Sequence, residues 1–403
     1  MALFSLSVFQ QTPEAVNIQN QKPLHRTQIL KWTLQMVVGL GIFPALPAIS
    51  QDQTAVQTVA LSGTEIDLNR LASLSKGPIL RQLKLDGAPL SDEGLAMIAS
   101  LSSLEELSLE RCECSDRLFE VLADSKKLKR LRLRSLSLSD LGLVKLSALD
   151  RLELLEITDC TGFSQLGLES IASLTKLRSL TLSGQSVGDS VLLKLKSLSN
   201  ITSLALRHAP ISNEGFRVLE HFPKLKELDV YGTSVSSDFL ANIPYPASLI
   251  KMKLRSTSIA SKQIVQGIAR FENVSALDLG ENDLDATAIG SIAQLEKLED
   301  LNLLRTKLSK DAVRILCESP ANARLKKLNL DDNSAIDDMS IDSLLILKSL
   351  EFLHLGKTQV TDTGIQKLSS LAQLKTLIVN DTAVTQESLQ LLQSALPNLR
   401  IVR

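Results

Sequence analysis

The chain has 403 residues, with 44 Lys and Arg against 45 Asp and Glu, which gives a formal net charge of −1. This balance offers no basic stripe of the kind that nucleic-acid binding normally demands, so we expect no nucleic-acid partner. With 44% hydrophobic but only 3% aromatic residues, the chain can bury a large aliphatic core yet offers few aromatic anchors for a ligand.

The first fifty residues do not follow the pattern of the rest of the chain. A basic stretch (residues 22–31) precedes an apolar run (residues 32–48) that ends in small residues at Ala48 and Ser50. That order is typical of a secretory signal, so residues 1–50 are predicted to be a signal peptide or another N-terminal targeting segment. An uncleaved anchor and a tail without a targeting role are the alternatives, although prolines inside the run argue against a membrane-spanning helix.

From residue 51 to residue 403, a short strand of the form Leu-x-Leu recurs every 24 or 25 residues, with one gap of 27. A fixed period in this range is the signature of a solenoid, in which each repeat packs only on its neighbours. Residues 51–403 are therefore predicted to form one domain of about fourteen repeats. The first apolar residues of the clear copies are Leu83, Leu107, Leu131, Leu155, Leu180, Leu204, Leu228, Met252, Leu277, Leu301, Leu328, Leu353 and Leu377.

Each predicted strand is followed by a turn and a helix. A Ser, Thr or Asp stands six residues after the second strand leucine, as at Ser91, Ser115, Ser139, Ser212 and Thr361, where its side chain can cap a helix start. Apolar residues then follow at the helical spacing of three to four. Because strands lie about 4.8 Å apart and helices 8–10 Å apart, the stack must curve. The predicted fold is an α/β solenoid, a right-handed horseshoe with a parallel sheet on the concave face and helices on the convex face.

The best copy of the repeat runs from Leu350 to Ile365 and reads Leu-x-x-Leu-x-Leu-x-x-Thr-x-Val-Thr-Asp-x-Gly-Ile. This pattern resembles the leucine-rich-repeat superfamily, closest to its ribonuclease-inhibitor-like branch and to exported bacterial proteins with 24-residue repeats. The resemblance implies the horseshoe fold. The resemblance does not indicate a binding partner, because members of the family bind many unrelated partners and the repeat motif itself is structural.

The residues that carry most protein chemistry form no convincing site. Cys112 and Cys160 hold the same slot two repeats apart, about 10 Å by strand spacing, whereas a disulfide requires Cα atoms within about 7 Å. All four cysteines, with Cys114 and Cys317, are predicted to be buried thiols. The histidines have no metal-ligand spacing, and His354, between two strand leucines, is predicted to be solvated. The sequence thus indicates no cofactor, no metal site and no enzyme activity.

The concave face is the predicted binding surface. Residues between and just after the strand leucines project from it, because the side chains of a strand alternate. They are charged residues of both signs with one aromatic, Tyr231, and Arg and Tyr are common at binding hot spots. The competing interpretation is that any solvated sheet face of this fold carries such residues. The candidate ligand-binding residues are Arg132, Arg134, Arg207, Asp229, Tyr231, Lys253 and Arg255.

The function predicted from these features is an exported, non-catalytic protein that binds a protein or a polymer, such as a peptide or glycan chain, on its concave sheet and is secreted or periplasmic. An intracellular, cytoplasmic adaptor of the substrate-recruiting ubiquitin-ligase type, or a delivered bacterial effector, is the alternative. A third hypothesis is that the protein is a purely structural component of a surface layer or scaffold. No stable membrane insertion is expected after signal removal. The last strand, residues 399–403, is followed by no capping segment, and such an edge predicts an end-to-end homodimer.

Overall fold

The structure is a computed structural model, in which the repeats form one unit, Ala55–Arg403. The predicted signal segment, residues 1–50, lies outside the described residues. The described residues are 57–63, 66–76, 79–235 and 238–403.

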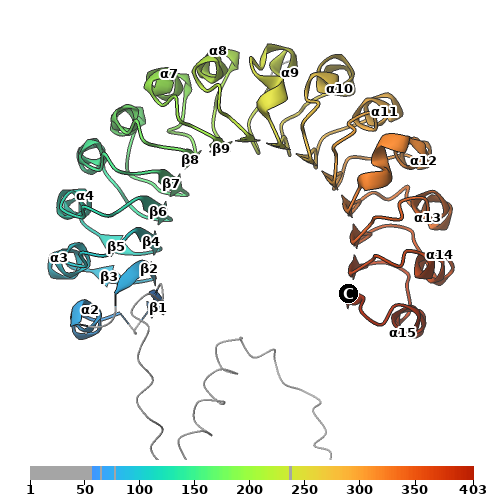
Figure 1. The fold of residues 1–403 in the computed structure, drawn as a ribbon, viewed down its shortest axis with the longest axis horizontal. Coiled ribbons are helices and arrows are strands. Elements are labelled where there is room, and N and C mark those ends of the chain that lie inside the picture. Colours follow the sequence, from blue (N-terminus) through green and yellow to red (C-terminus); the bar gives the residue numbers. More distant parts are fainter. Residues whose placement is uncertain (1–56, 64–65, 77–78, 236–237) are drawn as a thin grey trace, which may run out of the picture. The chain divides into compact units, whose positions relative to one another are not determined.

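The inner wall of the repeat unit is one parallel sheet of 15 strands, which follow one another in chain order around an arc (Figure 1). The strands are β1 (Gln57–Ser62), β2 (Leu80–Asp86), β4 (Glu106–Glu110), β6 (Arg130–Arg134), β7 (Leu154–Thr158), β8 (Ser179–Ser183), β9 (Ser203–Arg207), β10 (Glu227–Asp229), β11 (Lys251–Lys253), β12 (Ala276–Asp278), β13 (Asp300–Asn302), β14 (Lys327–Asn329), β15 (Phe352–His354), β16 (Thr376–Ile378) and β17 (Arg400–Val402). A second, two-stranded sheet pairs β3 (Pro89–Leu90) with β5 (Glu113–Cys114).

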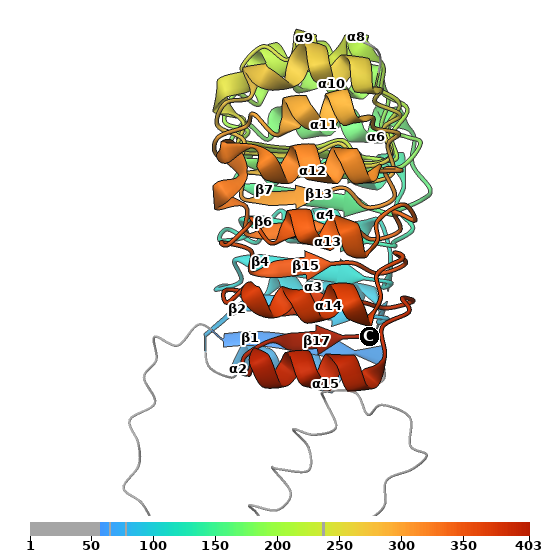
Figure 2. The same cartoon turned by 90° about the vertical axis from the view of Figure 1, so that its right-hand side faces the viewer.

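Helices form the outer wall and stack beside one another across the repeats, so the predicted α/β solenoid is confirmed (Figures 1 and 2). The α-helices are α2 (Leu68–Lys76), α3 (Asp92–Ala99), α4 (Arg117–Leu122), α5 (Asp140–Val144), α6 (Gln165–Leu168), α7 (Asp189–Lys194), α8 (Asn213–Phe216), α9 (Phe239–Asn242), α10 (Ser261–Gly267), α11 (Ala286–Ile292), α12 (Lys310–Glu318), α13 (Asp338–Leu344), α14 (Asp362–Lys367) and α15 (Gln386–Ala395). Short 3-10 helices are η2 (Lys145–Ala148), η3 (Glu169–Ser173), η4 (Leu195–Ser197), η5 (Arg217–His221), η6 (Pro246–Ser248), η7 (Ile268–Arg270), η8 (Pro320–Arg324) and η9 (Leu368–Ser370).

The core lies between the two walls and is built from the predicted strand leucines. Leu83, Leu107, Leu131, Leu328 and Leu353 are all completely buried, and each such side chain contributes roughly 1.5–3 kcal/mol on burial. The buried apolar residues of every repeat belong to one continuous cluster. A repeat therefore gains its core only by stacking on its neighbours, and the stacked strands expose their other face on the inside of the arc.

Most helix starts are capped by the residues that the sequence predicts. In each, a side-chain hydroxyl accepts a hydrogen bond from a backbone N–H in the first turn, and these hydroxyls belong to Ser91, Ser139, Ser212 and Thr361. At Ser115 the helix starts one residue later than predicted, because the N-cap of α4 is Asp116, although the Ser115 hydroxyl still accepts a hydrogen bond from Arg117 N at 3.4 Å. The helix starts therefore follow the repeat pattern with local shifts at α4 and α9, whose N-cap is Asp238.

Neighbouring helix starts are also joined to one another. The Asp189 carboxylate of α7 accepts bonds from the backbone N–H and hydroxyl of Ser212 in the next repeat, at 2.8 and 2.5 Å. Thr385 binds Asp362 in the same way, at 2.7 and 2.8 Å, and these two bonds hold the pKa of Asp362 below its ordinary value. A glycine inside the next helix leaves room for the carboxylate, since a Cβ at Gly215 would lie only 2.3 Å from Asp189 Oδ1.

We expect Gly215→Ala to lower the free energy of unfolding by about 1–3 kcal/mol, because the added methyl group displaces the Asp189 carboxylate from Ser212. Urea unfolding followed by circular dichroism measures the loss. In an Asp189→Ala background the same change should cost much less, since the two residues are in contact. Gly290→Ala is the matched control, because its Cβ would meet Ile315 at an ordinary 3.6 Å. Equal losses at Gly215 and Gly290 would contradict the prediction.

Candidate ligand-binding surface

The first group of predicted binding residues lies on β6. Arg130, Arg132 and Arg134 follow one another on the concave side of this strand, and we call them the arginine cluster. On one side Glu106 of β4 binds Arg130 Nε at 2.8 Å and also pairs with Arg132. On the other side Glu156 of β7 lies 2.9 Å from Arg134 Nη2 and 3.5 Å from Arg132 Nε. Two carboxylates thus hold three cations in a row.

The environment of Glu106 explains why this carboxylate stays charged. Glu106 is 7% exposed, and burial raises its pKa. The hydrogen bond from Arg130 and the charges of Arg132 and Arg130 lower it by more, so the pKa of Glu106 lies below its ordinary value. The arginine cluster is therefore compensated from within the sheet before any ligand arrives.

A second group of predicted residues lies on β9, β10 and β11, at the middle of the sheet. Asp229 is 8% exposed, and its Oδ2 lies 2.8 Å from Arg207 Nη2 and 3.7 Å from Lys253 Nζ. Its Oδ1 accepts a hydrogen bond from the backbone N–H of Tyr231 at 3.1 Å. Asp229 therefore orients two cations and the backbone that carries Tyr231.

Tyr231 is held between a histidine and an arginine. Its ring meets His208 edge to face, with ring centroids 4.5 Å apart, and the Arg255 guanidinium lies 5.5 Å from its centroid. Arg255 Nη2 also pairs with Glu281 at 2.6 Å, while its buried Nε has no hydrogen-bond partner. Together with Arg207, Asp229 and Lys253, the residues His208, Tyr231 and Arg255 make up what we call the central cluster.

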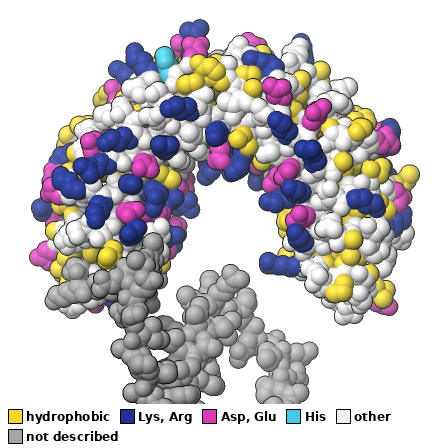
Figure 3. Space-filling model, in the orientation of Figure 1, with side chains coloured by type: hydrophobic (Ala, Val, Ile, Leu, Met, Phe, Trp, Pro, Cys, Tyr) yellow, Lys and Arg dark blue, Asp and Glu magenta, His cyan; other side chains and the backbone are white. Residues whose placement is uncertain are grey.

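The structure therefore splits the seven predicted residues into two groups rather than one patch. The arginine cluster and β9 are separated by β7 and β8, a distance of roughly 14 Å at the usual strand spacing. Figure 3 shows cationic and acidic side chains mixed around the arc, so neither sign dominates the face in view. A ligand that reaches both clusters would have to lie along the arc across several repeats.

Several members of these clusters were not predicted. Arg130 and Glu106 stand directly before the first strand leucine, and strand alternation places that position on the concave side too. Glu281 lies beyond the end of β12 with a positive φ of 59°, so alternation could not have indicated its contact with Arg255. The ion pairs themselves join different strands, and they follow only once the register is known.

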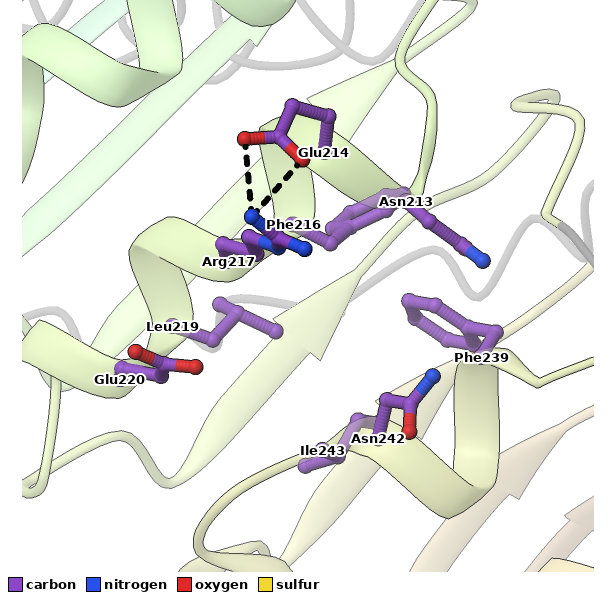
Figure 4. Close-up of a pocket in the computed structure, with 9 residues that line it drawn as sticks. All are labelled: Asn213, Glu214, Phe216, Arg217, Leu219, Glu220, Phe239, Asn242 and Ile243. Carbon is purple, nitrogen blue, oxygen red and sulfur yellow. Dashed lines mark hydrogen bonds and ion pairs between the residues drawn. The ribbon is translucent and has the colours of Figure 1, made fainter.

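The convex face carries a separate pocket of about 360 Å³ between the α8 and α9 repeats (Figure 4). Phe216 and Phe239 form part of its lining and meet edge to face with centroids 4.8 Å apart, and Glu214 pairs with Arg217 at the rim at 3.1 Å. The pocket adjoins the short helix α9, which ends at Asn242, shortly before the sequence Pro-Tyr-Pro at residues 244–246. None of the predicted binding residues lines this pocket.

The cysteines are all free thiols in the structure. Cys112 and Cys317 are buried as predicted, whereas Cys114 and Cys160 are half-buried. Burial raises the pKa of Cys114 to about 11 and that of Cys317 to about 12. At these values less than about 1% of either thiol is ionised near neutral pH, so neither has the activated thiolate of a catalytic cysteine.

Within the part of the chain that the structure describes, no group of three or more His, Cys, Asp or Glu side chains is arranged to hold a metal ion. No helix there combines the length and the apolar character needed to cross a bilayer.

Comparison with known proteins identifies the repeat. Residues 347–369 match the sequence family described as "Leucine Rich repeat". The chain is 32% identical over 167 residues to NACHT, LRR and PYD domains-containing protein 9 of Bos taurus, and 26% identical over 179 residues to tubulin-folding cofactor E of Arabidopsis thaliana. These stretches are 39% and 43% of this chain but only 15% and 33% of the two relatives.

Solved structures share the fold at lower identity. An internalin from Listeria monocytogenes matches with a TM-score of 0.51 and 21% identity, and a chain from the Rad7 and Elc1 complex of yeast with 0.54 and 18%. Each match covers 84% of this chain and 88% of the other chain. Repeat proteins of this architecture generally use their long concave surface for interaction with other proteins.

Proposed function

The chain is a leucine-rich-repeat protein, and on that premise we propose that it is a non-catalytic binding protein that holds a protein or peptide on its concave sheet. The proposal rests on the central cluster. Tyr231 and Arg255 are of the residue types that dominate binding hot spots, and both are half-buried and already oriented by neighbours. Little side-chain entropy is left to lose when a ligand binds there, which favours affinity.

The mixed charge of the surface bears on the kind of ligand. Asp229 and Glu281 stand beside Arg207, Lys253 and Arg255, so both acidic and basic groups of a ligand can find partners. The scarcity of aromatic side chains leaves no platform for stacking sugar rings. A protein or peptide surface with charges of both signs fits this combination best.

A capture experiment with quantitative mass spectrometry tests the proposal. The full chain serves as bait beside the variants Tyr231→Ala and Arg255→Ala, and beside Arg314→Ala as a control on the convex helix α12. The specifically captured protein should fall at least tenfold with the two concave variants, since hot-spot residues contribute about 2 kcal/mol or more. It should persist with Arg314→Ala. Equal capture by all four baits would place the binding site away from the central cluster.

We also propose that the protein is exported, secreted or periplasmic, on the basis of the basic, apolar and small residues that follow one another in residues 1–50. Fractionation with N-terminal sequencing tests this. Mature protein that starts near Gln51 and lies outside the cytoplasm is the expected result. Intact Met1 in the cytosol would contradict it.

The second candidate is an intracellular adaptor. It draws support from the fold that this chain shares with a chain of the Rad7 and Elc1 complex, which is an assembly of two proteins. The same fractionation separates this candidate from the first. The contact between two copies through residues 399–403 stays a prediction, and sedimentation over a range of concentrations tests it.

A further inference from the structure

The row of outward-facing residues on the concave sheet is interrupted at Gly356. This glycine lies two residues after the end of β15, and Asp331 and Asn380 hold the same position after β14 and β16. The pairing of the strands continues this far, because Asp332 N donates to Gly356 O at 3.0 Å and Lys357 N donates to Asn380 O at 2.9 Å. Asp331 and Asn380 therefore flank a position that has no side chain.

Three polar atoms converge on the space above this glycine. A Cβ at Gly356 would lie 2.5 Å from Asn380 Oδ1, 2.7 Å from Asp331 Oδ1 and 2.9 Å from His354 Nε2. Any side chain there would fill the space between them. The three atoms come from three adjacent strands, so neighbouring repeats build one small polar cradle.

One of these atoms lacks a partner. Asp331 Oδ1 is buried and receives no hydrogen bond, although a buried carboxylate oxygen normally has one. His354 Nε2 is 3.8 Å away, too far for a hydrogen bond, and is hydrogen-bonded instead to Asn380 Oδ1 at 3.1 Å, a bond that a cation between the two atoms would replace. The Asn380 amide donates from Nδ2 to Asp381 at 3.1 Å, and this bond turns Oδ1 toward the histidine.

We propose that Asp331 Oδ1, His354 Nε2 and Asn380 Oδ1 form a binding site for a divalent transition-metal cation. Metal–ligand bonds of roughly 2.0–2.2 Å place neighbouring donor atoms about 3.0–3.6 Å apart, close to the 3.1 and 3.8 Å observed from His354 Nε2. A cation between them gives the orphaned carboxylate oxygen its partner. The third donor is an amide oxygen, so the site contains only two His, Cys, Asp or Glu side chains.

The donor types narrow the choice of ion. An imidazole nitrogen suits Zn²⁺ and its first-row neighbours, whereas Ca²⁺ and Mg²⁺ prefer oxygen donors alone. Cu²⁺ binds mixed nitrogen and oxygen sites more tightly than Zn²⁺, but Zn²⁺ has no redox chemistry and no geometric preference of its own, so it is the suitable probe of this site. With one carboxylate and three protein ligands, the site is expected to be weaker than a four-ligand structural zinc site, with water at the remaining positions.

Titration of the full chain with zinc chloride, followed by nitrogen NMR of labelled histidines, tests the proposal directly. Resonances of the His354 ring, identified by their loss in His354→Gln, should shift as Zn²⁺ is added. The same concentration of Ca²⁺ should leave them unchanged. Zinc shifts confined to other histidines, or no shift of His354 at millimolar Zn²⁺, would overturn the assignment, and an equal response to Ca²⁺ would overturn the choice of ion.

Calorimetry on variants supplies the second measurement. Asp331→Asn keeps the shape of the side chain and removes its charge, and Gly356→Ala fills the cradle. Each should weaken the zinc affinity of this site at least tenfold while the circular dichroism spectrum stays that of the wild type. His221→Ala, on the convex 3-10 helix η5, should bind like the wild type. Unchanged zinc affinity in Asp331→Asn and Gly356→Ala would contradict the proposal even if the His354 resonances shift.

Discussion

Replacing Asn333 by alanine should lower the free energy of unfolding by roughly 3–5 kcal/mol, more than most core truncations of similar size. Asn333 is 1% exposed. Its Oδ1 accepts the backbone N–H groups of Thr306 and Leu308 at 3.1 and 3.0 Å, in the repeat before its own. Its Nδ2 donates to the carbonyls of Leu303 and Leu330 at 2.8 and 3.0 Å. Alanine leaves three of these groups buried without a partner, while the Leu303 carbonyl keeps its bond from the Thr306 hydroxyl at 2.8 Å.

Urea unfolding measures the total loss, and hydrogen exchange at the Thr306 and Leu308 amides locates it. Asn333→Thr is the matched variant, because the equivalent Thr358 bonds the carbonyl three residues before it in its own repeat, at 2.7 Å. Threonine should therefore recover the local bond but not the three that reach the preceding repeat, and its loss should be intermediate. A loss below about 1 kcal/mol in the alanine variant, with the Thr306 and Leu308 N–H groups still protected from exchange, would show that water takes the place of the Asn333 side chain.

Asn333 also shows which contacts of the fold could not be predicted from the sequence. The period of 24 or 25 residues predicted the strands of the 15-stranded sheet, because an apolar residue that packs in the core recurs at each, whereas β3 and β5 were not predicted. Three residues after the second strand leucine, the Thr306 hydroxyl bonds a carbonyl of its own turn at 2.8 Å, which is a local turn preference. The bonds that Asn333 accepts from Thr306 and Leu308 join residues 27 and 25 positions apart in the sequence. Local turn preferences cannot predict bonds between residues so far apart.

For the candidate site, too, the sequence predicted local properties of each strand but not the contacts between strands. Alternation along a strand correctly put the Arg132 and Arg255 positions on the concave side, which is a local property of the backbone. Which acid meets which base depends on the register between strands and on side-chain rotamers. The partners Glu106 and Glu281 came from positions outside the predicted set. The gap at Gly356 is likewise visible only when three repeats are laid side by side.

The second large effect is expected at Glu106, whose removal should cost roughly 2–3 kcal/mol, because its bonds to charged partners are lost. Glu106→Ala leaves Arg130, Arg132 and Arg134 adjacent with only Glu156 to compensate them, and water screens part of their repulsion because these side chains are partly exposed. Urea unfolding at pH 7 measures the loss. Glu110 on the same strand is the control, because it is more exposed and pairs with Arg111 at the surface. Its alanine variant should lose less than about 1 kcal/mol.

The pH dependence separates the charge of Glu106 from its packing. Because the folded-state pKa of Glu106 lies below the ordinary value of about 4.5, its negative charge stabilises the folded protein above that pH. This contribution is lost as the pH falls through the folded-state pKa. Glu106→Gln keeps the size of the side chain but cannot ionise. The wild type should therefore exceed this variant in stability at pH 7, and the difference should shrink below about pH 4.5. A difference that stays constant from pH 7 to pH 3 would mean that Glu106 acts through packing alone. The arginine cluster would then be held by Glu156 and the strand itself, and its cations would be freer to meet a ligand than the structure indicates.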